Sequence, residues 1–217
     1  MTDSAMIILR ALGALLSYPR PELHEALPEI ADAIRASPLM RAQDRAAVLR
    51  LVELLASADP LWAEERYVEL FDRDRATALH LFEHVHGEAR DRGDAMVELK
   101  AIYERAGFYL AVNELPDYLP VVLEYLSCRT LAEARDMLGD CAHILRAIGE
   151  ALLQRGSPYS AVFSAVLGIV GEAGLDEKAA ARRRAEVEDL DRDWFEQPAF
   201  APGAPAAGAG PGRMQGC

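Results

Sequence analysis

Cysteine, aromatic residues and positive charge are all scarce in this chain of 217 residues. Its three cysteines, Cys128, Cys141 and Cys217, show no C-x-x-C spacing, so neither a disulfide framework nor a zinc or redox motif is indicated. This use of cysteine fits a reducing cytoplasm, where we expect the protein to act. The net charge is −12, which repels a phosphate backbone and argues against DNA or RNA as a partner.

Membrane spans and nucleotide-binding loops are also missing from the pattern. Arg10 interrupts the apolar run near the N-terminus and no basic residue precedes that run, which matches neither a signal peptide nor a membrane span. Direct insertion into a membrane is therefore not expected. The glycines are scattered, and none stands in a G-x-x-x-x-G-K-[ST] or G-x-G-x-x-G motif, so nucleotide binding is unsupported.

The residues that are abundant favour helices. Ala, Leu, Glu and Arg dominate while aromatics make up 7%, and the first group forms helices readily whereas strands favour aromatic and β-branched residues. We expect an all-α fold, a single-domain helical bundle over residues 1–200. From Pro198 onwards fifteen of twenty residues are Pro, Gly or Ala, which predicts a disordered tail over 201–217.

Helical spacing of the apolar residues and turn signals between them predict where the helices lie. Asp59 is a favourable N-cap and Pro60 suits the first helical position, so one helix should begin here and run to about Phe71. Asp117 should cap another helix in the same way, with Pro120 in its first turn. The remaining helices are expected over 5–17, 22–36, 41–56, 79–86, 88–106 and 131–154, and from residue 157.

The segment LHLFEHVHGEARDRG, residues 79–93, holds three of the five histidines. Taken as a helix, it places Phe82 and Val85 on the core side, while His80 and His84 point away. Two histidines four residues apart share a helix face, so a metal site is one hypothesis, although it needs a third ligand from another segment. Surface histidines and one half-buried histidine held by hydrogen bonds are the alternative that we favour.

Two further segments could contribute to a binding surface. Tyr67, Leu70 and Phe71 form an i, i+3, i+4 stripe that is typical of a core, and a buried Tyr67 hydroxyl needs a hydrogen-bond partner. In the second segment, Asp117 and Glu124 are seven residues apart and should share one negative helix face. No nucleophile has a base at a suggestive spacing, so no catalytic residue is predicted; acids beside apolar grooves suit a basic amphipathic peptide instead.

Four motifs, ERYVELFDR, LHLFEHVHGEARDRGDAMV, LPDYLPVVLEYL and GSPYSAVF, occur in this order. Together they resemble the NarJ branch of the TorD/DmsD-like redox-enzyme maturation chaperones, over about residues 8–200. The closing WFEQPAF is similar to the W-x-E-x-P ending of that family. The resemblance implies a peptide-binding groove, which we assign to these residues: Tyr67, Leu70, Phe71, Asp72, His80, Phe82, Glu83, His84, His86, Glu88, Asp91, Arg92, Asp117, Tyr118 and Glu124.

What the resemblance implies is a cytoplasmic chaperone without enzymatic activity. Such a protein holds the apo catalytic subunit of nitrate reductase by its N-terminal, leader-like peptide until the molybdenum cofactor (bis-MGD) is inserted, before membrane assembly. The chaperone itself is expected to bind no cofactor stably. The competing hypotheses are a helical metal-binding protein using His80 and His84, and a helical transcription regulator, against which the absence of a basic recognition helix counts.

Overall fold

The computed structural model describes residues 6–85, 89–111, 114–176, 178 and 180–182, without the side chains of 89–91. Every regular element in these ranges is helical, so the all-α expectation is confirmed. The elements are α1 (Ile7–Leu15), α2 (Pro21–Ala36), α3 (Ala42–Ser57), α4 (Pro60–Tyr67), the π turn η2 (Val68–Asp72), the 3₁₀ turns η3 (Arg75–Thr77) and η4 (Leu81–Glu83), α5 (Ala89–Arg105), α6 (Leu119–Ser127), α7 (Leu131–Asp140), α8 (Ala142–Gln154) and α9 (Ser160–Val170).

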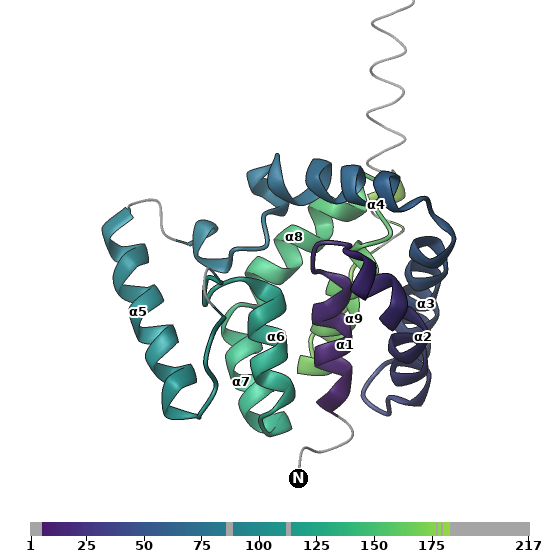
Figure 1. Ribbon diagram of the computed structural model, residues 1–217. Coiled ribbons are helices and arrows are strands. Elements are labelled where there is room, and N and C mark those ends of the chain that lie inside the picture. Colours follow the sequence, from purple (N-terminus) through teal and green to yellow (C-terminus); the bar gives the residue numbers. More distant parts are fainter. Residues whose placement is uncertain (1–5, 86–88, 112–113, 177, 179, 183–217) are drawn as a thin grey trace, which may run out of the picture.

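Helix α1 lies inside the bundle, flanked by α6 on one side and α2 on the other, with α9 behind it (Figure 1). Helix α3 packs on α2 and α9, and α8 packs on α9, while α4 runs across one end of the bundle (Figure 1). The close fit of α1 and α6 depends on Gly13. A Cβ atom at this position would lie 3.1 Å from the Pro120 carbonyl oxygen and 3.2 Å from Leu123 Cβ, so a larger residue would push the two helices apart.

The start of α4 agrees with its sequence signals. Asp59 accepts hydrogen bonds from the amides of Leu61 and Trp62, and Pro60 occupies the first turn. Beyond Tyr67 the helix continues as the π turn η2, which contains Phe71, so the predicted end of this helix is confirmed. The change from α to π geometry has no marker in the sequence.

The short helix expected over 79–86 is not present in the described part of that segment. Instead His80 forms an isolated antiparallel bridge with Tyr118, and only the turn η4 follows. The Leu81 amide donates to the Asp117 carbonyl at 3.0 Å, and the Leu119 amide donates to the Leu79 carbonyl at 2.9 Å. Pairing with the residues before α6 therefore replaces local helical hydrogen bonds. Val85, predicted to lie on the core side, is 52% exposed.

Two other expectations about helix ends are wrong. The N-cap of α6 is Tyr118, not Asp117, because the Asp117 carboxylate turns away from the helix towards the Phe82 amide. Pro120 does lie in the first turn of α6, as predicted. The single helix expected over 131–154 is divided at Cys141 into α7 and α8.

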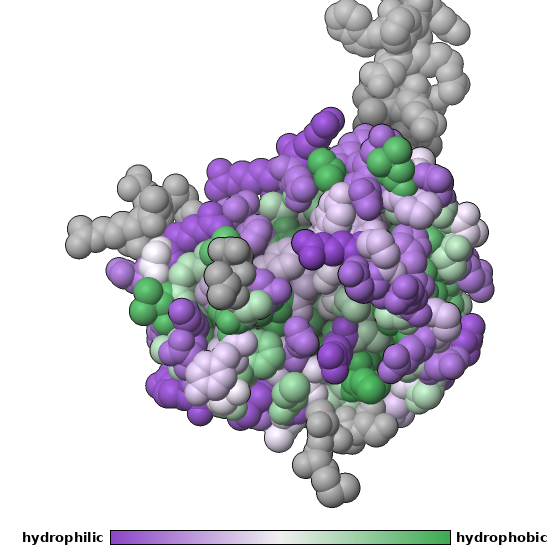
Figure 2. All heavy atoms as spheres, in the orientation of Figure 1, coloured by the Kyte–Doolittle hydropathy of each residue, from purple (hydrophilic) through white to green (hydrophobic). Residues whose placement is uncertain are grey.

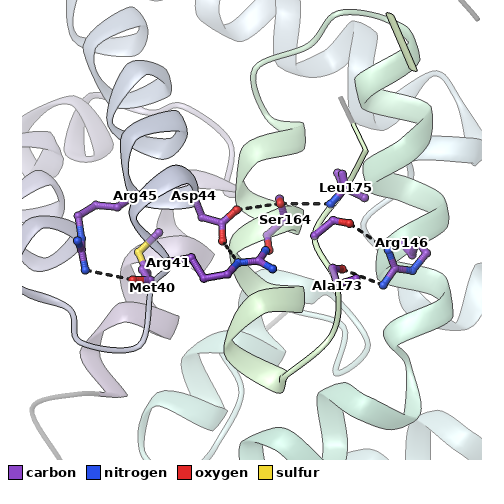
Figure 3. A network of polar contacts seen from close by, with 9 residues as sticks. Met40, Arg41, Asp44, Arg45, Arg146, Ser164, Ala173 and Leu175 are labelled. Atoms are coloured by element: carbon purple, nitrogen blue, oxygen red, sulfur yellow. Dashed lines mark hydrogen bonds and ion pairs between the residues drawn. The ribbon is translucent and has the colours of Figure 1, made fainter. Parts of the chain in front are cut away.

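A network of polar contacts joins α3, α9 and the segment after α9 (Figure 3). Asp44 is buried; one carboxylate oxygen lies 2.5 Å from Nε of Arg41, and the other accepts from the Ser164 hydroxyl at 2.9 Å. The Ser164 hydroxyl also accepts from the Leu175 amide at 3.3 Å. Arg146 donates to the Ala173 carbonyl at 2.9 Å. These contacts fix the path of the chain beyond Gly171, whose positive φ of 92° ends α9.

Helix α5 stands at the edge of the bundle (Figure 1). Among its described side chains only Tyr103 is buried, and its hydroxyl donates to the Pro116 carbonyl at 2.9 Å. The Tyr103 ring lies 4.5 Å from the ring of Tyr125 on α6, measured between centroids. Tyr103, together with the partly buried Leu99 and Ile102, thus anchors the C-terminal half of this helix.

None of the helices in the described ranges combines the length and the apolar character needed to cross a membrane. The predicted tail over 201–217 and the WFEQPAF motif lie outside the described residues.

Candidate functional site

Two tyrosines connect three of the predicted site segments. Tyr67, at the end of α4, is buried, and its hydroxyl donates to the Leu16 carbonyl at 2.9 Å. The Tyr118 hydroxyl lies 2.8 Å from that of Tyr67, and the Tyr118 ring lies beside His80 with centroids 5.2 Å apart. Burial, more than any neighbouring charge, raises the pKa of both tyrosines, so both hydroxyls remain neutral hydrogen-bonding groups. The partner expected for a buried Tyr67 hydroxyl is therefore present.

Asp117 organises the residues next to this pair. Its side chain is fully buried and accepts a hydrogen bond from the Phe82 amide at 3.2 Å. His80 Nδ1 lies 3.3 Å from one carboxylate oxygen, and an Arg92 nitrogen lies 3.7 Å from the other. Arg92 also contacts Glu83 at 3.2 Å, which ties the start of α5 to η4. Asp117 therefore fixes the positions of His80, Phe82 and Arg92 beside the tyrosine pair.

A hollow of about 260 Å³ opens beside these residues, between α1 and α6. Its lining includes Arg10, Ala14 and Ser17 from α1 and the turn after it, and Glu114, Tyr118 and Glu124 from α6 and the residues before it. We call it the α1–α6 hollow. Figure 2 looks onto this face, where hydrophilic side chains border a recess between the two helices. Two carboxylates at an open recess give it a negative rim.

The structure divides the predicted site residues into groups. Tyr118 and Glu124 line the hollow, whereas Leu70 and Phe71 are core residues and Asp72 is exposed. The predicted shared face of Asp117 and Glu124 is wrong, because Asp117 is buried before α6 begins while Glu124 is exposed on α6. A third group does not line the hollow but joins the neighbouring segments through hydrogen bonds and ion pairs: Tyr67, His80, Phe82, Glu83, Arg92 and Asp117.

Four predicted residues remain, and three of them, His86, Glu88 and Asp91, lie outside the residues or side chains that the structure describes. His84 is half-buried, and its Nε2 atom lies 2.9 Å from the Ala78 carbonyl oxygen. The imidazoles of His80 and His84 thus have separate partners. Within the described ranges, no three His, Cys, Asp or Glu side chains gather as metal ligands would, so the metal hypothesis gains no support there.

Sequence reasoning missed the contribution of α1. Arg10, Ala14 and Ser17 line the hollow, but none of them belongs to a motif that we singled out as part of a binding site. One available signal was Arg10 itself, a charge in the middle of an apolar run. In a helix so close to the bundle centre, such a residue marks the exposed face.

Comparisons with known proteins give a consistent result. Residues 18–165 match the family model described as nitrate reductase delta subunit. The chain is 43% identical over 197 residues to the nitrate reductase molybdenum cofactor assembly chaperone NarJ of Escherichia coli K12, which covers 88% of this chain and 84% of that protein. It is 38% identical over 197 residues to the probable chaperone NarW of the same strain, covering 88% and 82%. Identity to the probable NarJ of Bacillus subtilis 168 is 31% over 176 residues, covering 81% and 95%.

Proposed function

Because the chain belongs to the nitrate reductase delta subunit family, we propose that it is an assembly chaperone for a nitrate reductase. In this proposal it binds the N-terminal peptide of the apo catalytic subunit in the cytoplasm and keeps that subunit competent for molybdenum cofactor insertion. The curated relatives described above are named as assembly chaperones and not as catalysts, so no chemical step is assigned to this chain. The molybdenum cofactor is cargo of the partner enzyme.

The observation that carries the peptide part of the proposal is the α1–α6 hollow with its two rim carboxylates, Glu114 and Glu124. The side chain of Tyr118 offers an aromatic surface in the lining of the hollow, and carboxylates at the rim favour a basic partner. An amphipathic helix is the form in which a short peptide best presents apolar and basic side chains to such a recess. The net charge of −12 adds long-range attraction for a basic peptide.

The first test is calorimetric titration with a synthetic peptide that copies the N-terminus of the partner catalytic subunit. We expect micromolar or tighter binding, about −8 kcal/mol. The Glu114→Gln/Glu124→Gln double variant should bind the peptide roughly tenfold more weakly, because the peptide's basic groups lose their rim partners. Glu53→Gln, an exposed carboxylate on α3 outside the hollow, is the matched control and should bind like the wild type. A folded wild type that does not bind the peptide would refute the peptide proposal.

The second test concerns assembly and does not depend on the peptide. In cells that lack this chaperone, the catalytic subunit should accumulate without molybdenum, which metal analysis of the purified enzyme would detect. Restoring the wild-type gene should restore the metal. A catalytic subunit with its full molybdenum content in the absence of the chaperone would refute the assembly role.

A further inference from the structure

A second hollow lies on the other side of α1. It has a volume of about 340 Å³ and is lined by Ile7, Ala11 and Ala14 from α1 and by Ala26, Ile30 and Ala33 from α2. We call it the α1–α2 hollow. Arg10 and Ala14 line both this hollow and the α1–α6 hollow, so the two recesses meet over the exposed face of α1.

The α1–α2 hollow is suited to an aliphatic side chain. Its lining is apolar apart from Arg10 and Glu29, and Ile7 is 49% exposed although it is a large hydrophobic residue. The four alanines leave space between α1 and α2 that larger residues would fill. An apolar side chain from a partner would bury this surface and be removed from water in turn.

Charge on this face points to a basic partner. Exposed carboxylates of Glu22, Glu25 and Glu29 follow the outer side of α2 at helical spacing, and Glu124 lies across α1 from them. Among the described lining residues of the two hollows, Arg10 is the one cation. Its guanidinium lies 3.8 Å from the Glu124 carboxylate, and both side chains are largely exposed. An ion pair so open to solvent is weak and easily exchanged for another.

From this arrangement we infer that the bound peptide crosses α1, placing an aliphatic side chain in the α1–α2 hollow and a basic side chain on Glu124 in place of Arg10. This inference rests on the proposed function, since it takes the same peptide as the ligand. A helix is about 10 Å wide and rises 1.5 Å per residue, so about seven residues of helical peptide suffice to cross α1. Glu29 then receives a second basic group of the peptide. Arg10 lies between the two recesses, and its side chain moves away from Glu124 when the peptide binds.

The experiment repeats the calorimetric titration with the same peptide and three variants. Ala26→Leu fills the α1–α2 hollow and should weaken binding about tenfold, whereas Glu29→Gln should weaken it about threefold. Arg10→Ala should strengthen binding about threefold, because it removes the cation that competes for Glu124. Ala147→Leu on α8 and Glu53→Gln on α3 are matched controls at exposed positions outside both hollows, and they should bind like the wild type.

The outcomes separate this inference from the proposal beneath it. Tight binding by the wild type that is unchanged in Ala26→Leu and in Arg10→Ala would overturn the inference and leave the peptide proposal standing. A wild type that does not bind the peptide would overturn both. Arg10 and Glu29 are exposed, so their variants report on binding even if Ala26→Leu disturbs the packing of α2.

Discussion

Replacing Asp117 tests whether this buried carboxylate stabilises the segments beside the α1–α6 hollow. The carboxylate is fully buried, accepts from the Phe82 amide and lies between His80 and Arg92. Asp117→Asn keeps the side-chain shape and one acceptor oxygen but loses the negative charge. Asp117→Ala loses the side-chain shape, both acceptor oxygens and the charge. Both variants should destabilise the junction between η4, α5 and α6.

The size of the effect follows from the groups left without a partner. An unsatisfied buried amide costs ~1–3 kcal/mol, and Phe82 is only half-buried, so losing the acceptor for its amide gives about 1 kcal/mol. The side chains of His80 and Arg92 are 31% and 28% exposed, so water compensates part of their loss and about 1 kcal/mol remains for both. We therefore expect Asp117→Ala to lower the free energy of unfolding by ~2 kcal/mol and Asp117→Asn by ~1 kcal/mol.

Urea unfolding followed by far-ultraviolet circular dichroism measures this difference. With a slope of roughly 2 to 3 kcal/mol per molar for a domain of this size, the midpoint should fall by about 0.8 M in Asp117→Ala and by about half as much in Asp117→Asn. Glu124→Gln is a suitable control because that carboxylate is exposed. Equal midpoints for wild type and Asp117→Ala would refute the supporting role assigned to this carboxylate.

Three further predictions concern stability and thiol reactivity. Tyr67→Phe removes the closer of two hydroxyl donors to the buried Leu16 carbonyl and leaves Tyr118 at 3.5 Å, so the free energy of unfolding should fall by ~1 kcal/mol in the same urea assay. Burial raises the pKa of Cys141 to about 11, so pulsed alkylation at pH 8 with mass spectrometry should label the exposed Cys128 well before Cys141. Hydrogen bonds, first from the Thr130 amide, lower the pKa of Glu133 to about 2, so its stabilising effect is complete above the unfolded pKa and is lost as pH falls towards 2. The melting temperatures of wild type and Glu133→Gln should therefore differ by a constant amount above pH 5 and converge below pH 4; a gap that widens on acidification would contradict this.

The fold was predictable wherever the structure is decided locally. Asp59 and Pro60 act within one helical turn, and both perform the roles read from the sequence. The segment from Leu79 to Val85 was not predictable in the same way, because its hydrogen bonds go to residues more than thirty positions later, around Asp117. A periodicity argument considers neighbours along one helix and has no means of weighing a distant bridge.

The candidate site shows the same limit. Tyr118 and Glu124 were found because they belong to a recognisable motif, and both line the α1–α6 hollow. Asp117 was also found, but its direction was misjudged, since a residue that can cap a helix can equally accept from an amide of another segment. The part played by Ala14 and Ala26 could not be seen, because an alanine that leaves a space has the same appearance in a sequence as one that fills it.

The isolation of α5 has a consequence for how the molecule opens. Tyr103 is the one fully buried side chain among those described on this helix, and Leu99 and Ile102 are only partly buried against the core, so the backbone hydrogen bonds of α5 rely less on the core than those of α1 and α6. In a hydrogen-exchange experiment the amides of α5 should therefore exchange through a local opening, well before those of α1 and α6. Tyr103→Ala should lower the free energy of this opening without unfolding the remaining helices, because the other attachments of α5, the partly buried Leu99 and Ile102 and the ion pairs of Arg92, are weaker. Helix α5 then behaves as a separate cooperative unit at the edge of the bundle.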